Sequence, residues 1–152
     1  MISPCTWTSA VGVLNELLPG CDSFLPDAIA AAAEKSGHSV VFLPLPEWES
    51  MPDTDIIALL ISVDLRDDER LIVVTEASWF KKVGPLEMVG SDLSGFLANH
   101  WSTYGEFAVD GDLVLVLLDR KSICIFHHEG FYCTLKLASP SATGRIGKTL
   151  NQ

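Results

Sequence analysis

The sequence predicts an α+β fold, in which N-terminal helices pack on a mainly antiparallel sheet that ends in a three-stranded meander. Apolar residues follow a helical spacing in the first 36 residues, whereas residues 113–137 hold three apolar segments separated by short polar turns. Strands and helices do not alternate regularly between these two regions. We expect residues 1–137 to form one globular domain and the Ser/Thr/Gly-rich residues 138–152 to form a flexible C-terminal tail.

Two helices are expected in the N-terminal region. The first covers residues 9–18, and Thr8 or Ser9 can cap it, because their hydroxyl oxygens accept hydrogen bonds from free backbone N–H groups. The second covers residues 25–36. Its run of alanines has high helix propensity, and Pro26 suits a first helical turn, where its missing N–H group is not needed.

The central region is expected to contain strands and one helix. Residues 39–43 form a short apolar run with two valines, which favours a strand. Residues 55–63 are apolar enough for either a buried strand or a buried helix, and we interpret them as a strand that pairs with residues 71–75. A helix is expected over residues 91–104, ended by a glycine.

The C-terminal meander is the clearest pattern in the sequence. Its strands are expected at residues 113–118, 122–128 and 131–137. If Glu129-Gly130 forms a two-residue turn, pairing across the last hairpin places six side chains on one face: Cys124, Phe126, His128, Phe131, Cys133 and Leu135.

Composition excludes several classes of protein. The chain of 152 residues carries 20 acidic and 10 basic residues, a formal charge of −10, which argues against direct binding to nucleic acid. The longest apolar run is far shorter than the roughly 20 residues that span a bilayer, so we expect no membrane association. The N-terminus has no basic signal-peptide region, and the four cysteines form no disulfide or zinc pattern. These features predict a cytoplasmic protein with reduced thiols and no cofactor.

The acidic residues are concentrated in the first half of the chain. Residues 1–80 contain 13 acids and 3 bases, and residues 47–69 alone contain eight acids and only Arg66 as a base. Several of these acids flank expected strands, in loops that can converge on one edge of the sheet and attract a basic protein. We predict a partner-binding surface formed by Glu47, Trp48, Glu49, Asp53, Asp67, Asp68 and Glu69. In this hypothesis Trp48 is an exposed anchor; the alternatives are that the acids are plain solvated surface and that Trp48 caps the core.

No catalytic or metal-binding motif is evident, so we expect a binding protein and not an enzyme. The tripeptide His127-His128-Glu129 is the main candidate for chemistry. Consecutive strand residues point to opposite faces, so we expect the two imidazoles not to share a metal ion. Two of the four tryptophans, Trp7 and Trp101, fit core-facing helix positions.

The chain resembles the small acidic immunity proteins of bacterial toxin–immunity pairs, including those of contact-dependent growth inhibition. The resemblance is one of type and not of motif. It depends on the acidic stretch 47–69 with Trp48 and on the C-terminal segments 111–119 and 126–130. It implies a cytoplasmic inhibitor that binds and neutralises a basic toxin domain, with nucleases among the candidates. No site residue transfers from such proteins, because they share no diagnostic motif.

Two other functions remain open at this point. One is a small enzyme that uses a site formed by His127, His128 and Glu129. The other is a self-associating interaction module, in which the apolar face of the last hairpin is buried against a second copy. The sequence does not determine the oligomeric state.

Overall fold

The computed structural model describes residues 1–61 and 64–137, which fold around one antiparallel sheet of seven strands. The strands lie in the order β1-β4-β3-β5-β6-β7-β2, and every neighbouring pair is antiparallel. Their bounds are β1 Ser3–Pro4, β2 Leu43–Pro44, β3 Arg70–Val74, β4 Leu86–Val89, β5 Leu113–Leu117, β6 Ser122–His127 and β7 Phe131–Lys136.

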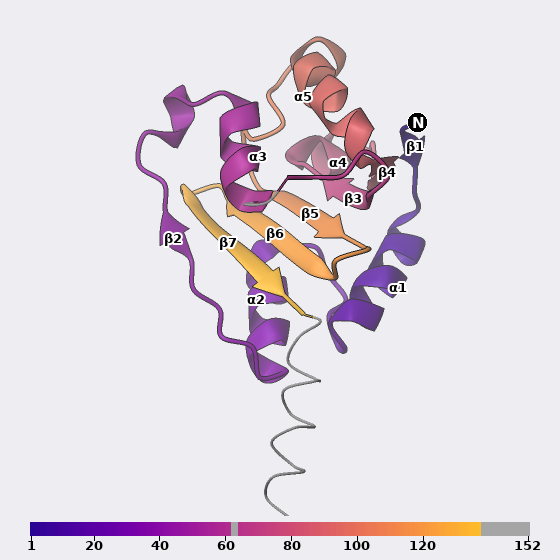
Figure 1. Ribbon diagram of the computed structural model, residues 1–152, viewed down its shortest axis with the longest axis vertical. Coiled ribbons are helices and arrows are strands. Elements are labelled where there is room, and N and C mark those ends of the chain that lie inside the picture. The colour runs from indigo at the N-terminus through magenta and orange to yellow at the C-terminus, as the bar shows by residue number, and fades with distance from the viewer. Residues whose placement is uncertain (62–63, 138–152) are drawn as a thin grey trace, which may run out of the picture.

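Helices cover both faces of the sheet, so the molecule has three layers (Figure 1). Helices α1 and α2 pack on one face, and α3 and α5 pack on the other. The short helix α4 follows β3, and a 3-10 turn, η1, precedes α3. The bounds are α1 Trp7–Leu17, α2 Pro26–Lys35, η1 Trp48–Ser50, α3 Asp53–Ile61, α4 Glu76–Phe80 and α5 Gly90–Tyr104.

The central strands are buried on both faces, which explains their unbroken apolar sequences. In β5, Leu113, Leu115 and Leu117 face α3 and α5, whereas Val114 and Val116 face α1 and α2. Because side chains alternate along a strand, a sheet with helices on both sides needs an apolar residue at every position. The same alternation recurs in β3 and β6.

The predicted α+β class, the two N-terminal helices, the helix ending at Tyr104 and the C-terminal meander are all confirmed. The cap of the first helix is Thr6 and not Thr8 or Ser9, since the Thr6 hydroxyl accepts the N–H of Ser9 at 3.0 Å. Gly105, in the left-handed region at φ 77°, ends α5 as expected.

The predicted strand over residues 55–63 is wrong, because residues 53–61 form helix α3. Its buried residues are Ile56, Ile57, Leu60 and Ile61, a spacing that places them on one side of a helix. The partners of β3 are therefore β4 and β5. The expected strand over 39–43 is reduced to Leu43–Pro44, and β4 was not predicted at all.

The predicted register of the last hairpin is also wrong, by one residue. His127 pairs with Phe131, so the turn holds three residues, 128–130, and ends with Gly130 in the left-handed region at φ 88°. The shift sends alternate side chains to opposite faces. Cys124 therefore lies among the residues facing α3, whereas Cys133 lies among those facing α1 and α2.

The predicted tail, residues 138–152, lies outside the described residues. Within the described residues, no helix combines the length and the apolar character that crossing a membrane requires.

Candidate functional site

The seven residues predicted as a partner surface fall into two groups at opposite ends of helix α3. Residues 47–53 precede or begin this helix, and residues 67–69 follow it. Its nine residues span about 13 Å. Strand β3 begins directly after Glu69. Its five residues are about 17 Å long, which is the distance between the same two ends of the sheet. The acidic stretch therefore does not form one surface.

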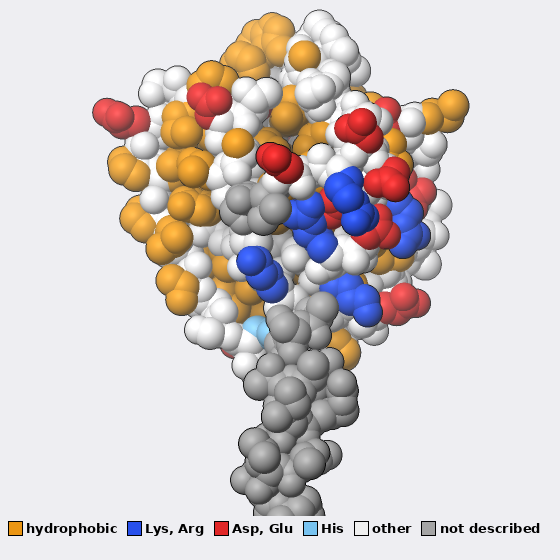
Figure 2. Space-filling model, in the orientation of Figure 1, with side chains coloured by type: hydrophobic (Ala, Val, Ile, Leu, Met, Phe, Trp, Pro, Cys, Tyr) orange, Lys and Arg blue, Asp and Glu red, His pale blue; other side chains and the backbone are white. Residues whose placement is uncertain are grey.

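Of residues 67–69, Asp68 and Glu69 contact basic side chains, whereas Asp67 is exposed and its backbone carbonyl accepts from the N–H of Ser91. Glu69 is only 1% exposed and forms a two-pronged ion pair with Arg120, one contact of which measures 2.6 Å. The guanidinium of Arg120 lowers the pKa of Glu69. Asp68 lies 3.6 Å from Arg66, and Figure 2 shows side chains of both signs intermixed beside the β5–β6 turn. Glu69 is thus a structural ion-pair partner, inaccessible to a binding protein.

Trp48 is partly buried, so the expectation of an exposed anchor is wrong. Its ring meets Phe126 edge-on at 5.1 Å and packs against the core below α3. A side chain at Gly130 would come within 2.7 Å of the Trp48 ring, so the absence of a Cβ there makes room for the indole. Trp48 caps the core and thereby fixes the loop that carries Glu47 and Glu49.

A cleft of about 600 Å³ opens beside Trp48, where the loop before α3 meets the loop before β5. Its apolar lining includes Met51, Ile56 and Phe107, and its acidic lining consists of Glu49, Asp53 and Asp110. Asp53 anchors the two loops to each other, because its Oδ2 accepts the backbone N–H of Ala108 at 2.9 Å.

Another groove of about 390 Å³ runs between α3 and α5. Its lining is largely aliphatic, and Asp64 is the one acid among the described residues that line it. It brings together no cluster of charged or titratable groups. We therefore place the candidate site at the cleft beside Trp48.

Further acids lie at the same end of the sheet as this cleft, and the fold brings them in from distant segments. Glu76 follows the end of β3, Glu106 and Asp112 lie in the loop before β5, and Glu129 lies in the β6–β7 turn. All these segments meet at one end of the sheet. We call this region the acidic end and define it by eight residues: Glu47, Glu49, Asp53, Glu76, Glu106, Asp110, Asp112 and Glu129. Within residues 1–61 and 64–137, no Lys or Arg forms an ion pair with these eight carboxylates.

Two carboxyls of the acidic end have raised pKa values. Burial raises the pKa of Asp53, and the hydrogen bonds from the backbone of residues 108 and 109 only partly offset it. Burial also raises the pKa of Glu76, and the neighbouring carboxylates of Glu106 and Asp112 raise it further. Partly buried like charges oppose folding, and groups perturbed in this way are concentrated at functional sites.

A buried histidine holds the loop of the acidic end in place. The Nδ1–H of His100 donates to the carbonyl of Glu106 at 2.6 Å, so its Nε2 accepts from the Thr75 hydroxyl at 3.4 Å. The ring lies between Phe96 and Tyr104 on α5. His100 therefore connects helix α5, the end of β3 and the acidic loop.

Trp101 and Phe107 form an exposed aromatic pair beside the cleft. Their ring centroids are 4.9 Å apart, and they are 55% and 52% exposed. The expectation that Trp101 faces the core is thus wrong, whereas Trp7 is partly buried and stacks on Trp79. Helical spacing gives no signal for this exposure, because Trp101 lies four residues after the buried Leu97, at a position that shares its helix face.

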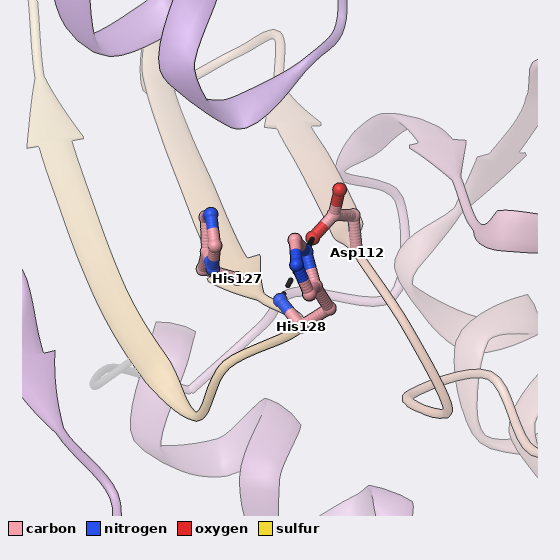
Figure 3. A group of neighbouring side chains, drawn as sticks. All are labelled: Asp112, His127 and His128. Carbon is pink, nitrogen blue, oxygen red and sulfur yellow. Dashed lines mark hydrogen bonds and ion pairs between the residues drawn. The ribbon is translucent and has the colours of Figure 1, made fainter.

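His127 and His128 lie side by side at the acidic end, next to Asp112 (Figure 3). Their rings stack at 4.3 Å, so the expectation that they point to opposite faces is wrong. The strand ends at His127, and His128 already belongs to the turn. The side-chain partner of His128 is Asp112 and not Glu129: Asp112 Oδ1 accepts from His128 Nδ1 at 2.8 Å, which raises the pKa of that histidine.

The signal for most of the acidic end is absent from any single stretch of sequence. The acids at positions 76 and 129 are isolated in the sequence, and only the antiparallel order of β3, β5, β6 and β7 brings them beside the acids of the loop 106–112. No protein-family model matches this chain, and no similarity was found to a curated protein or to a solved structure.

Proposed function

We propose that this protein is an immunity-type inhibitor in the cytoplasm, which binds a basic toxin domain through the acidic end and acts by binding and not by catalysis. One observation carries the proposal: eight acids from four segments gather at one end of the sheet, three of them lining a cleft, without a Lys or Arg ion-pair partner among the described residues. A surface of this kind attracts a basic partner and speeds its association.

The chemistry of the cleft supports a partner rich in lysine or arginine. Glu49, Asp53 and Asp110 can accept hydrogen bonds from a cationic side chain. The exposed rings of Trp101 and Phe107 offer aromatic faces to the same kind of cation. Nucleases bind phosphates through clustered basic residues, so a nuclease domain is the toxin class that this surface suits best.

Affinity capture from a lysate of the source organism tests the proposal. The tagged protein is expected to retain one basic protein in equimolar amount at low salt and less of it at high salt, because screening weakens charge attraction. Expression of the captured protein alone should arrest growth, and co-expression with this chain should restore growth. Recovery of this chain alone, or of a partner without toxicity, would contradict the proposal.

A matched pair of variants tests the position of the binding surface. The first, Glu47→Gln/Glu49→Gln/Asp110→Asn, removes three exposed charges at the acidic end. The second, Asp64→Asn/Asp67→Asn/Asp68→Asn, removes three exposed charges at the opposite end. We expect the first variant to bind the captured toxin at least tenfold more weakly and the second to bind it normally. The reverse result would move the surface to residues 64–68.

A further inference from the structure

A second chemical feature at the acidic end is a cluster of one carboxylate and two imidazoles. Asp112, His127 and His128 each offer one ligand atom, and these three atoms lie within 4.8 Å of one another (Figure 3). Asp112 Oδ1 accepts from both the ring Nδ1 and the backbone N–H of His128, at 2.8 and 2.7 Å. The three-residue β6–β7 turn makes this approach possible, because it folds His128 back beside His127.

The donor types are those of a transition-metal site. Imidazole nitrogens combined with a carboxylate suit Zn²⁺, Co²⁺, Ni²⁺ and Cu²⁺, whereas Ca²⁺ and Mg²⁺ prefer sites made of oxygen atoms. Tetrahedral zinc with bonds of about 2.0–2.1 Å holds its ligand atoms roughly 3.3 Å apart. The three groups therefore need to approach one another by about 1.5 Å at most. The His128 side chain is 55% exposed, so a shift of this size displaces mainly solvent.

The surroundings both favour a cation and restrain the rings. Asp27 lies 3.8 Å from His127 Nε2, and Phe42 packs edge-on against the His127 ring. The Nδ1 of His127 accepts only a 3.2 Å hydrogen bond from the backbone N–H of Glu129, which coordination at the ring would replace. Carboxylates around the cluster make the local potential negative, so a divalent cation is attracted to it.

We propose that Asp112, His127 and His128 bind one divalent transition-metal ion of the zinc type at the surface of the acidic end. Three protein ligands leave a fourth position for water or for a donor from another molecule. The site does not depend on the proposed inhibitor function, because it requires only residues of this chain. It differs from the proposed enzyme site in that Asp112, and not Glu129, is the carboxylate.

Titration of the metal-free full-length protein with Zn²⁺, followed by calorimetry, tests the site. We expect one equivalent to bind, and we expect Asp112→Asn, His127→Gln and His128→Gln each to weaken binding by about tenfold or more. His38→Gln is the matched control, since this histidine lies outside the cluster, and Zn²⁺ binding should not change. Cys5→Ser, introduced into every protein compared, removes the one described cysteine that is not buried.

Nuclear magnetic resonance provides a second readout that needs no substitution in the cluster. Zn²⁺ should shift the ring signals of His127 and His128 in the unaltered chain and leave those of His38 unchanged. Absence of binding by the wild-type chain would overturn the proposal. Zn²⁺ binding that persists in all three cluster variants, or that disappears with Cys5→Ser alone, would overturn it as well.

Discussion

Glutamate side chains experience two opposite environments in this protein. Glu69 is buried against the guanidinium of Arg120, which lowers its pKa. Glu76 is half-buried among other carboxylates, and its pKa is raised. The charge of Glu69 therefore stabilises the fold at neutral pH, whereas the charge of Glu76 opposes it. A residue whose charge opposes folding needs another reason to be there, and the proposed attraction of a basic partner would supply one.

Replacement of Glu69 by Gln should lower the free energy of unfolding by about 3 kcal/mol at neutral pH, because Arg120 loses its buried partner. The contribution of a carboxyl with a lowered pKa is present above its unfolded pKa and is lost as the pH falls through its folded pKa. The difference between wild type and Glu69→Gln should therefore shrink below about pH 4. Urea unfolding of both proteins over a pH series measures this difference in stability. Asp68→Asn, at an exposed ion pair, should change stability by less than about 0.5 kcal/mol.

Replacement of Glu76 by Gln should have the opposite sign. A carboxyl whose folded pKa is raised destabilises the protein once it ionises, and this cost is absent below its unfolded pKa. Glu76→Gln should therefore raise the free energy of unfolding at pH 7 beyond the roughly 0.5 kcal/mol scatter of surface substitutions, and the gain should vanish near pH 4. Urea unfolding of wild type and Glu76→Gln at these two pH values measures the gain. A loss of stability at pH 7 would show that the Glu76 carboxylate is a structural group.

At the scale of elements, local signals predicted the ends of the chain well and the middle poorly. The N-terminal helices have their own stop signals, and the meander has polar turns between its strands. Residues 55–61 have no such signal. The spacing of the buried residues distinguishes a helix from a strand, but the sequence alone does not show which of these apolar residues are buried. The strand β4 has four residues with two buried side chains, too short for a period-2 pattern to be detected.

The β6–β7 turn links this local structure to the site. The predicted two-residue turn is wrong, because the turn has three residues and Gly130 occupies the left-handed position at its end. That one-residue difference moved His128 out of the strand and beside His127 and Asp112. Gly130 also leaves the space that Trp48 occupies. One glycine therefore sets both the register of the last strand pair and the position of the loop before α3.

Replacement of Gly130 by Ala should destabilise the protein more than Gly20→Ala. Both glycines have positive φ values, 88° and 87°, so alanine is strained at each by roughly 1–2 kcal/mol. A Cβ at Gly20 meets nothing within 4 Å, whereas one at Gly130 meets the Trp48 ring at 2.7 Å. The free energy of unfolding should fall by at least about 1 kcal/mol more for Gly130→Ala. Equal losses for the two variants would mean that Trp48 moves aside freely.

At the scale of the whole molecule, the charge is organised by the sheet and not by the sequence. The two ends of the sheet differ: at one end three acids pair with Arg66, Arg70 and Arg120, whereas the acids at the other form the acidic end. The composition shows that the chain is strongly acidic, but helix α3 separates the two halves of the stretch 47–69 in space. The strand order determines which acids from other segments lie beside each half, and no local sequence pattern encodes that order.

This asymmetry makes a kinetic prediction for binding of the proposed toxin partner. Association of oppositely charged surfaces is accelerated by long-range attraction, which salt screens over about 8–10 Å. The association rate constant of the wild-type protein should fall at least about tenfold between roughly 0.05 and 0.5 M salt. Glu47→Gln/Glu49→Gln/Asp110→Asn should associate more slowly at low salt and approach the wild-type rate at high salt. Stopped-flow mixing at several salt concentrations measures these rates.

The matched variant Asp64→Asn/Asp67→Asn/Asp68→Asn separates a local field from total charge. Both triple variants change the formal charge by the same three units. If net charge alone drives association, the two variants slow it equally at every salt concentration. If the acidic end provides the attraction, only the first variant slows association, because the other three acids lie a strand length away, beyond the screening distance. Equal slowing would therefore remove the acidic end as the steering surface.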